Sequence, residues 1–318
     1  MFGICIESSH NRGMGHFFRC INLMKFLDKI NEKYIIFINK DSISNKYLDN
    51  NFIKYRIVDL DDFQSDWESK LIIEYKINIW INDRLDTDIE HAKNVVKNKI
   101  KLITFDDRGT GAELSDLNIS ALVFNNQDNL KGKKVLWGIK YLILNKEIER
   151  FKRIRKDLRK IIVTLGGSDT HGVTIDILKF LKRMDLGATI ITGPSFEHYE
   201  ELNNLVENKY RIKKNVPSLI NEFYEYDLAI TGGGITPFEA TASGLPCILV
   251  ANELHEIEVC SYLQSIGVGI FAGYYKEIDF DDFSNIVYKC EIEILSKQGI
   301  NKVSTNGLEN IYNEIIKL

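Results

Sequence analysis

Short apolar runs rich in β-branched residues alternate along the chain with longer stretches in which apolar residues recur at helical spacing. In the first half, Phe17–Ile30 is a clear predicted helix. The runs predicted as strands there are Gly3–Ile6, Tyr34–Ile38, Lys54–Val58, Ile77–Ile81, Ile100–Phe105 and Ile119–Phe124. Strands that alternate with helices in this way predict a parallel sheet with helices on both faces.

The same alternation begins again near residue 160. The strands predicted in this half are Lys160–Leu165, Gly187–Ile191, Tyr210–Ile212, Leu228–Thr231, Cys247–Val250 and Val268–Phe271. The pattern predicts an α/β fold of two successive domains, each with a doubly wound parallel sheet, that face each other across a cleft. We place the domains at residues 1–150 and 151–318, with a closing helix over Leu308–Leu318 that can pack back on the first domain.

Length and composition narrow the class of protein. The chain has 318 residues, which fits about two domains. Its net charge of −4 argues against a nucleic-acid partner, and no apolar run is long enough to span a membrane. The five cysteines are scattered without a CxxC pair. Together with the absence of a visible secretion signal, this predicts a cytoplasmic protein with reduced, buried thiols.

A glycine-rich turn, Arg12–His16, follows the first predicted strand and opens the first helix. Gly13 and Gly15 allow a ligand to approach the backbone closely, and backbone amides at a helix start favour anions. The third glycine of a dinucleotide fingerprint is replaced by Phe18, and no carboxylate ends the second strand. The turn therefore predicts an anion site but not NAD binding, and no P-loop motif occurs in the chain.

His16 stands at the start of that helix, where the helix dipole disfavours the imidazolium ion. A neutral histidine there is a candidate general base. The alternative is a surface or capping histidine. Arg19, one turn further on, either faces an anion or is solvated.

Two further glycine-rich turns lie in the second half. Thr164–Asp169 ends a predicted strand, so that Gly167 and Ser168 form a candidate phosphate cradle, with Asp169 as a candidate helix cap. The alternative is a plain tight turn.

The turn Thr231–Glu239 is more informative. The sequence predicts free amides at Gly233, Gly234, Ile235 and Thr236 ahead of a helix, with Pro237 at its favoured first position. Such amides suit a diphosphate. Glu239 lies about one nucleoside length away and is a candidate for binding both ribose hydroxyls; the alternative is a carboxylate favoured by the helix dipole.

Collinear segments spread over nearly the whole chain resemble a known family. They are GMGHFFRCINL (13–23), ITFDD (103–107), GIKYLIL (138–144), IIVTLGGSD (161–169) and YDLAITGGGITPFEATASGLP (226–246). The set resembles the nucleotide-sugar hydrolases of the pseudaminic acid pathway, which remove UDP from a 2,4-diacetamido-2,4,6-trideoxy sugar. These enzymes are related to the MurG-type GT-B glycosyltransferases.

The resemblance implies a GT-B-like fold of two Rossmann-like domains, and it also implies roles for individual residues. By position, His16 matches the catalytic histidine, the Gly233–Thr236 turn the diphosphate site, and Glu239 the ribose-binding acid. The backbone from Ile212 to Val216 matches the region that holds uracil. The remaining residues expected at the ligand are, on the nucleotide side, Gly167 and Ser168 and, on the sugar side, Gly13, Gly15, Arg19, Asp107, Tyr141, Asn252 and His255.

The function implied is an inverting, histidine-assisted hydrolysis of a UDP-sugar to free sugar and UDP, with no metal or cofactor. One alternative is a glycosyltransferase that uses the same nucleotide site, and another is a non-catalytic subunit that binds a nucleotide sugar. The chain departs from the family where sugar or phosphate is contacted. Cys5 and Glu7 replace an Arg-x-Asp pair, Asn145 replaces an arginine, and Ala251–Glu256 replaces an AeNQ-like segment.

Other acidic residues and histidines have competing interpretations. Asp86 and Asp88 form a DxD pattern, which is read as a helix cap rather than a metal site. The segment Asp106–Arg108 either orients His16, binds sugar hydroxyls or is a solvated turn. The histidines predicted to lie at the surface are His91, His171 and His198.

Overall fold

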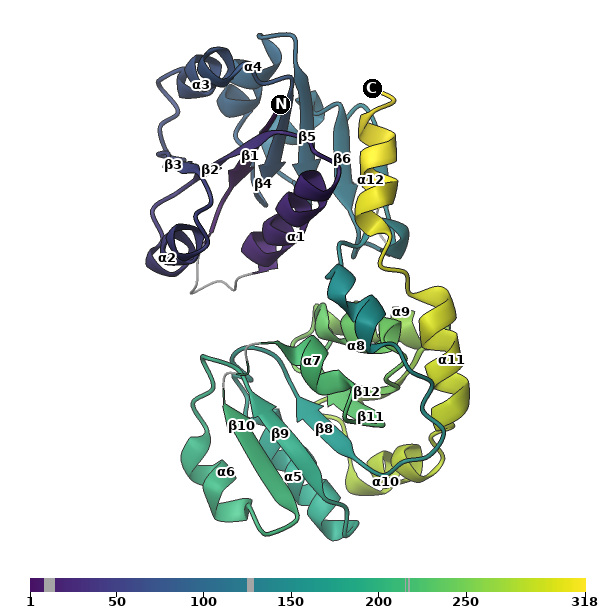
Figure 1. The fold of residues 1–318 in the computed structure, drawn as a ribbon. Coiled ribbons are helices and arrows are strands. Elements are labelled where there is room, and N and C mark those ends of the chain that lie inside the picture. Colours follow the sequence, from purple (N-terminus) through teal and green to yellow (C-terminus); the bar gives the residue numbers. More distant parts are fainter. Residues whose placement is uncertain (9–14, 125–128, 215, 217) are drawn as a thin grey trace. The chain divides into compact units, whose positions relative to one another are not determined.

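The computed structural model describes residues 1–8, 15–124, 129–214, 216 and 218–318, which form two compact units. The first unit comprises Met1–Leu144 and Asn306–Leu318, and the second comprises Asn145–Thr305. Each unit is built on one parallel sheet (Figure 1). The division falls before the predicted boundary at residue 150, and the last helix belongs to the first unit rather than to the second.

The first sheet has the strand order of a Rossmann fold. Its strands in spatial order are β3 (Tyr55–Ile57), β2 (Tyr34–Ile38), β1 (Phe2–Ile6), β4 (Ile79–Asp83), β5 (Lys101–Phe105), β6 (Leu117–Ser120) and β7 (Val135–Trp137). All neighbouring pairs are parallel. The strand order therefore reverses between β1 and β4.

Helices cover both faces of the first sheet. One face is covered by α1 (Gly15–Lys29), α2 (Ser42–Asn50) and α12 (Gly307–Ile315). The other is covered by α3 (Trp67–Tyr75) and α4 (Ile89–Val96). The described residues also form short 3₁₀ helices: η1 (Thr110–Leu114), η3 (Ile139–Tyr141) and, in the second unit, η4 (Lys146–Phe151).

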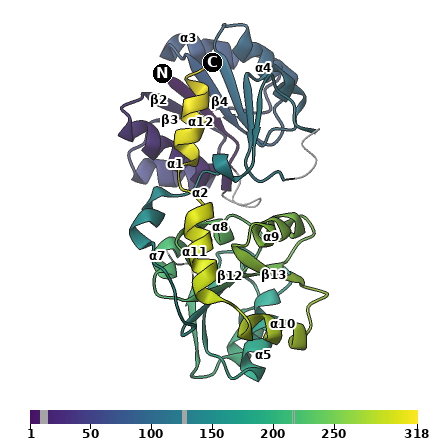
Figure 2. The ribbon, with the colours of Figure 1, turned by 90° about the vertical axis from the view of Figure 1, so that its right-hand side faces the viewer.

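The return of α12 to the first unit follows from its apolar stripe. Leu308, Ile311 and Ile315 recur at helical spacing and join the same core as the apolar residues of α1. Figure 2 shows α12, in yellow, lying along the first unit. At its start, a Cβ atom on Gly307 would lie 1.9 Å from the carbonyl oxygen of Leu142. Only glycine permits this approach, so the contact fixes where the helix begins.

The second sheet repeats the same strand order. Its strands in spatial order are β10 (Tyr210–Lys214), β9 (Ala188–Thr192), β8 (Ile161–Thr164), β11 (Leu228–Thr231), β12 (Cys247–Ala251) and β13 (Gly269–Tyr274). One face carries α5 (Val173–Arg183), α6 (Tyr199–Leu205) and α10 (Phe280–Tyr288). The other helices are α7 (Leu219–Phe223), α8 (Thr236–Ala242), α9 (Glu256–Ser265) and α11 (Ile292–Lys302). The prediction of two doubly wound parallel-sheet domains is confirmed.

Two strands differ from their predicted bounds because they contain buried polar residues. β6 begins at Leu117 and ends at Ser120, whereas the predicted run was Ile119–Phe124. Its Asn118 side chain is fully buried and donates to the carbonyls of Asp107 and Lys131, so a polar residue sits inside the strand. β4 likewise continues beyond Ile81 to Asp83. The apolar pattern misses the start of β6 and the end of β4 because polar residues are buried there.

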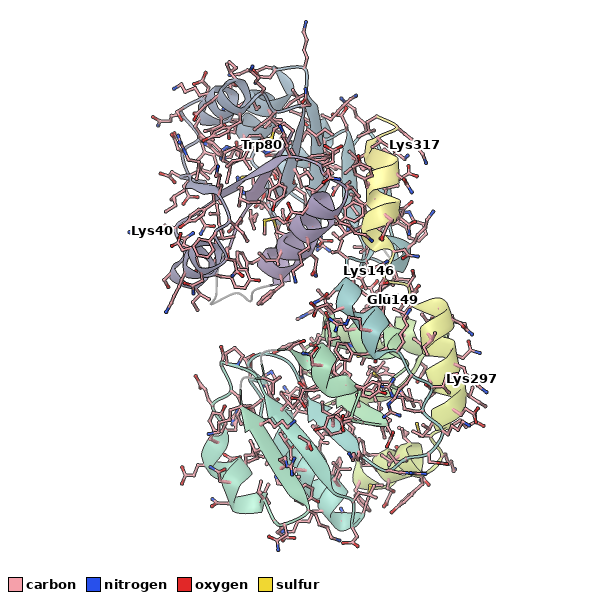
Figure 3. All side chains as sticks on the ribbon, viewed as in Figure 1. Lys40, Trp80, Lys146, Glu149, Lys297 and Lys317 are labelled. Atoms are coloured by element: carbon pink, nitrogen blue, oxygen red, sulfur yellow. The ribbon has the colours of Figure 1, made fainter. Side chains whose placement is uncertain are left out.

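The predicted burial of the thiols is confirmed for all of the cysteines but Cys290, which is half-buried. All five cysteines are free, and four of them are buried. Trp80 lies inside the first unit, whereas Lys40, Lys297 and Lys317 project outward (Figure 3). Within the described part of the chain, no helix combines the length and the apolar character that crossing a membrane requires.

A buried arginine joins the helix ends of the second unit. Arg155 is fully buried, and its guanidinium group donates to the carbonyls of Phe223 at 2.7 Å, Arg153 at 3.0 Å and Tyr226 at 3.1 Å. It also donates to the carbonyl of Ser243, just beyond α8. Burial lowers the pKa of Arg155, because every acceptor is a neutral carbonyl rather than a carboxylate. One side chain therefore satisfies the C-terminal ends of α7 and α8.

We expect Arg155→Met to lower the free energy of unfolding of the second unit by about 3 kcal/mol, because several buried carbonyls lose their donor. Urea unfolding followed by circular dichroism measures this change. Arg159→Met is the matched control: Arg159 is exposed, and its replacement should change the stability by less than about 0.5 kcal/mol. Equal urea midpoints for the two variants would show that Arg155 does not have this structural role.

Candidate functional site

Both sheets reverse their strand order at a central pair of strands, which is where doubly wound sheets bind ligands. In the first sheet, Ile6 at the end of β1 is in register with Asp83 at the end of β4. In the second, Thr164 at the end of β8 is in register with Thr231 at the end of β11. The three glycine-rich turns found in the sequence all follow one of these central strands.

His16 is paired with a carboxylate that the sequence analysis did not single out. The imidazole Nδ1 lies 2.5 Å from Oδ1 of Asp83, whose side chain is 3% exposed. A contact this short between two acceptors requires a proton between them, and we place it on Nδ1 because the pKa of Asp83 is lowered. Nδ1 then donates to Asp83, so the neutral form of the ring has its lone pair on Nε2. This is the arrangement of a general base.

Arg19 holds the same carboxylate from the other side. Its Nε donates to Oδ2 of Asp83 at 2.8 Å, its Nη2 donates to Oδ1, and its Nη1 donates to Asp106. The guanidinium carbon lies 5.0 Å from the centre of the Phe105 ring. All three nitrogens of Arg19 thus bind protein carboxylates, and the predicted contact between Arg19 and substrate stays a prediction.

The charges of this cluster determine the protonation of Asp83. Burial alone would raise the pKa of this carboxyl group, but Arg19 and the hydrogen bond from His16 outweigh burial and lower it. For Arg19, burial alone would lower the pKa, whereas Asp83 and Asp106 raise it. Asp83 and Arg19 are therefore both ionised at neutral pH.

Of two adjacent aspartates after β5, the structure brings Asp106 and not Asp107 to this cluster. Asp107 is fully buried, and its Oδ1 accepts from the backbone N–H groups of Thr87 at 3.0 Å and Gly109 at 2.9 Å. It organises the loop that follows β4, which does not fit its predicted contact with substrate. Asp106 has a left-handed backbone with φ of 52°, which directs its carboxylate to Arg19.

The turn after β11 presents backbone amides without partners. Among the described residues, the N–H groups of Gly233, Gly234, Ile235 and Thr236 have no hydrogen-bond acceptor. A Cβ atom on Gly233 would lie 2.6 Å from Cβ of Glu256 in α9, whereas one on Gly234 would meet only open space. Glycine is thus needed at one position for packing, while the next is free for a ligand. Four free amides at a helix start form an anion site.

Glu239 lies in the first turn of α8 and is partly buried without a charged or hydrogen-bonding partner among the described residues. Burial raises the pKa of its carboxyl group to about 7. A carboxyl group kept in such surroundings suits a ligand that donates hydrogen bonds to it, as a pair of vicinal hydroxyls does. The geometry is compatible with its predicted role.

The turn after β8 has one confirmed feature. The Asp169 carboxylate accepts from the N–H groups of Val173 at 2.8 Å and Thr174 at 2.9 Å, which confirms it as the cap of α5. Gly167 and Ser168 are exposed, and a Cβ atom on Gly167 would meet nothing within 4 Å. Both residues can therefore be reached by a ligand.

Asn252, at the end of β12, links these turns. Its Nδ2 donates to the carbonyl of Leu165 at 3.0 Å, and its backbone N–H donates to Glu256 at 2.7 Å. The side chain is buried, so its immediate role is to hold the turn after β8 against α9. His255 is exposed at the start of α9.

The remaining predicted residues are scattered. Gly13 lies outside the described residues, and Gly15 opens α1 with free space at its Cα atom. Tyr141 packs on the core of the first unit, where no hydrogen bond or ion pair of the described residues links it to His16. Ile212 lies in the edge strand β10 and Val216 just after it, both half-buried.

The structure also tests the interpretations of the DxD pattern and of His91. Asp88 caps α4 by accepting from the N–H of Glu90 at 2.7 Å, which confirms the cap interpretation of the DxD pattern. His91 is not at the surface: it is 3% exposed, contacts Glu68 through Nδ1 and lies 2.9 Å from the carbonyl of Leu60 through Nε2. The surface prediction for His91 was wrong because its helix face is covered by α3.

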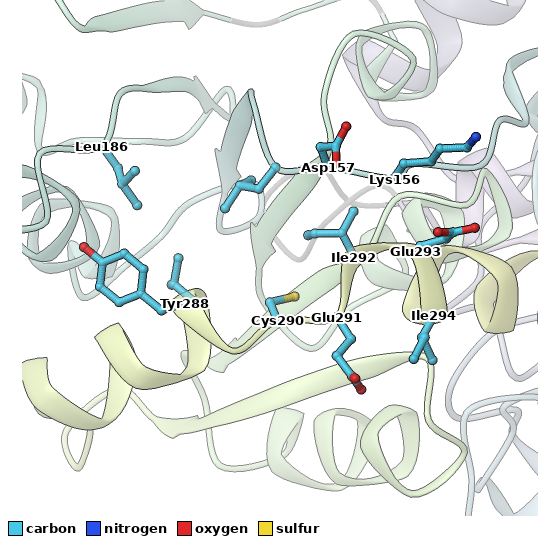
Figure 4. Close-up of a pocket in the computed structure, with 11 residues that line it drawn as sticks. Lys156, Asp157, Leu186, Tyr288, Cys290, Glu291, Ile292, Glu293 and Ile294 are labelled. Atoms are coloured by element: carbon cyan, nitrogen blue, oxygen red, sulfur yellow. The ribbon is translucent and has the colours of Figure 1, made fainter.

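A groove of about 400 Å³ in the second unit lies apart from these turns (Figure 4). It is bounded by the residues that precede β8 and by the connection between α10 and α11. None of the described residues predicted for the site lines it. Its thiol, Cys290, has a pKa raised to about 12 by burial and by Glu291, which leaves it unreactive at neutral pH.

Comparison with known proteins finds relatives of both sequence and fold. No protein-family model matches the chain. An uncharacterised protein of Methanocaldococcus jannaschii, MJ1062, is 30% identical over 98% of this chain, which spans 66% of that protein's length. The spore coat polysaccharide biosynthesis protein SpsG of Bacillus subtilis is 22% identical over 85% of this chain and 83% of its own length.

Solved structures share the architecture at low identity. MurG of Acinetobacter baumannii matches with a TM-score of 0.73 and 12% identity over 100% of this chain and 99% of its own. The chain has the GT-B fold. HepE of Anabaena, solved in complex with UDP, matches with a TM-score of 0.71 and 12% identity over 100% of both chains.

We expect the free energy of unfolding to fall by about 2 kcal/mol between pH 4.5 and pH 7 through Glu239 alone. The raised pKa of about 7 means that the folded protein keeps a proton which the unfolded chain loses near its ordinary value, so this stabilisation is complete at low pH and lost as the pH rises through 7. Glu239→Gln should remove this component. Urea unfolding of both proteins at pH 5 and pH 8 measures it, and an unchanged pH dependence in the variant would contradict it.

Proposed function

We propose that the protein binds a UDP-sugar through its second unit and that His16 of the first unit acts as general base at the sugar's anomeric carbon. The observation that carries this proposal is the pairing of His16 with the buried carboxylate of Asp83. The GT-B fold, the UDP complex of HepE and the polysaccharide biosynthesis named for SpsG support it.

The nucleotide half of the proposal rests on the turn after β11. A diphosphate placed against the free amides of Gly233 to Thr236 would be stabilised by oriented N–H groups and by the start of α8. The chain carries a net charge of −4, so local amides rather than the overall field must attract a diphosphate. Glu239 would then accept hydrogen bonds from the ribose hydroxyls.

The chemistry we propose is hydrolysis with inversion. Nε2 of His16 takes a proton from water while the water oxygen bonds to the anomeric carbon, and the bond between that carbon and the diphosphate oxygen breaks. UDP leaves with the electron pair, and the free sugar forms. The imidazolium ion is stabilised by Asp83, and the amides of the turn stabilise the charge on UDP.

The sugar we propose is a 2,4-diacetamido-2,4,6-trideoxy sugar, as in pseudaminic-like nonulosonic acid biosynthesis, on the basis of the family resemblance. The side chains that bind His16 and Arg19 do not stand at positions where the chain departs from the family pattern. Cys5 is buried within the core beside β4, and Asn145 caps η4 by accepting from the N–H of Glu147 at 2.9 Å. Glu7 lies with its carboxylate 4.0 Å from Nε of Arg84.

A glycosyltransferase is the second candidate, and the match to MurG favours it. The same base would take the proton of an acceptor hydroxyl instead of water. The two reactions differ in their products, since hydrolysis gives free sugar and UDP without an acceptor. A mass-spectrometric screen of UDP- and CMP-sugars, with and without acceptors, distinguishes them. Tight UDP binding without turnover of any sugar would instead indicate a binding subunit.

We expect His16→Asn to lower kcat by about 10²–10⁴ with the best UDP-sugar, because the proton acceptor is lost. The affinity for UDP, measured by calorimetry, should stay unchanged because the free amides belong to the second unit. Turnover at the wild-type rate in the variant would exclude His16 as the base.

We expect the affinity for UDP to be about tenfold weaker at pH 6 than at pH 8, because only about a tenth of Glu239 is ionised at the lower pH. In Glu239→Gln this contribution should disappear, while the titration of UDP itself remains the same for both proteins. Calorimetry at both pH values measures the difference. Equal pH dependence in the two proteins would count against ribose binding by Glu239.

A further inference from the structure

Arg19 places a positive charge directly beside the candidate base. Its Nη2 lies 3.0 Å from Nδ1 of His16, while Nε and Nη2 bind both oxygens of Asp83. Because Nδ1 already donates to Asp83, Arg19 cannot donate to the ring, and the approach is one between two donors. The side chain of Arg19 is 17% exposed, so solvent screens this repulsion only partly.

A histidine paired with an isolated carboxylate is driven toward the imidazolium form, which is useless as a base. Here the carboxylate of Asp83 is shared with a guanidinium group that binds both of its oxygens. The proton-attracting charge of Asp83 is thus largely neutralised, yet its oxygen still orients the ring. Arg19 therefore offsets the charge of Asp83 without displacing the Asp83 oxygen that orients the His16 ring.

The other titratable groups of the cluster do not replace Arg19. Asp106, after β5, is 29% exposed and binds Arg19 rather than the ring. The buried thiols Cys20 of α1 and Cys5 of β1 have pKa values raised by burial and remain neutral. With His16 neutral, the charged groups of the cluster among the described residues are therefore Asp83, Asp106 and Arg19.

We propose that Arg19 is a positioning residue that keeps His16 unprotonated at neutral pH, with its single proton on Nδ1, so that Nε2 is available as a base. This inference rests on the proposed function for its catalytic meaning, but not for the state of the ring. Asp106 serves the same end by fixing Nη1 of Arg19.

The variants Arg19→Met and Arg19→Lys separate charge from geometry. Without the charge, Asp83 favours the imidazolium ion, so the acid limb of the kcat/KM profile should move up by about two pH units, with about tenfold loss at pH 7 and recovery by pH 9. Lysine keeps the charge but not the two-point contact. It should lower kcat severalfold at every pH and leave the acid limb in place.

Nitrogen-15 NMR of the His16 ring tests the inference without any turnover. The wild-type protein, Arg19→Lys and Asp106→Asn should show a neutral ring with the proton on Nδ1 at pH 7, and Arg19→Met a doubly protonated ring. If Arg19→Met does not fold, Arg19→Met/Asp106→Asn, which removes one carboxylate together with the cation, takes its place. The same NMR result is expected for this double variant.

Two outcomes would overturn the inference. One is a neutral His16 ring at pH 7 after the charge of Arg19 is removed, with activity lost equally at all pH values. The other is a doubly protonated ring in Asp106→Asn, which keeps that charge. Failure of the proposed function is distinguishable, because it would appear as no turnover in the wild-type protein while the NMR result holds.

Discussion

The carboxylate of Asp83 is the constraint on which the first unit's site depends. It ends a central parallel strand at 3% exposure, and a charge in that position is tolerated only when partners replace its lost hydration. Arg19 and His16 supply these partners from the first turns of α1. The helix must therefore start where it does, with both side chains facing β4, and the imidazole of His16 is oriented by the same contacts that make the buried charge tolerable.

In the second unit, a buried charged side chain is bound by neutral groups instead of by groups of opposite charge. The guanidinium group of Arg155 finds only carbonyls, and the pKa of Arg155 is lowered, whereas carboxylates raise that of Arg19. Among its described residues, the second unit has a run of free backbone amides after β11. Amides carry no full charge of their own, so an anion held by them alone would be held by oriented dipoles rather than by an ion pair.

Apolar patterning predicted the architecture because parallel strands buried on both faces read as continuous apolar runs. It located His16 and the three glycine turns because glycine, proline and capping residues are local signals. It missed Asp83, since the predicted strand ended at Ile81 and the partner of His16 comes from a strand 67 residues away in sequence. The rule that ligands lie where the strand order reverses would have directed attention to that strand end.

The sequence pattern does not distinguish two adjacent aspartates either. The sequence places Asp106 and Asp107 equally at the end of β5, and only the left-handed backbone of Asp106 separates them, which a pattern of residue types does not contain. Asp107 turns inward to hold the amides of Thr87 and Gly109, so the loop after β4 keeps its shape. Asp107 therefore stabilises the loop after β4, whereas Asp106 holds the guanidinium group of Arg19. A site of this kind is specified by backbone conformation as much as by residue identity.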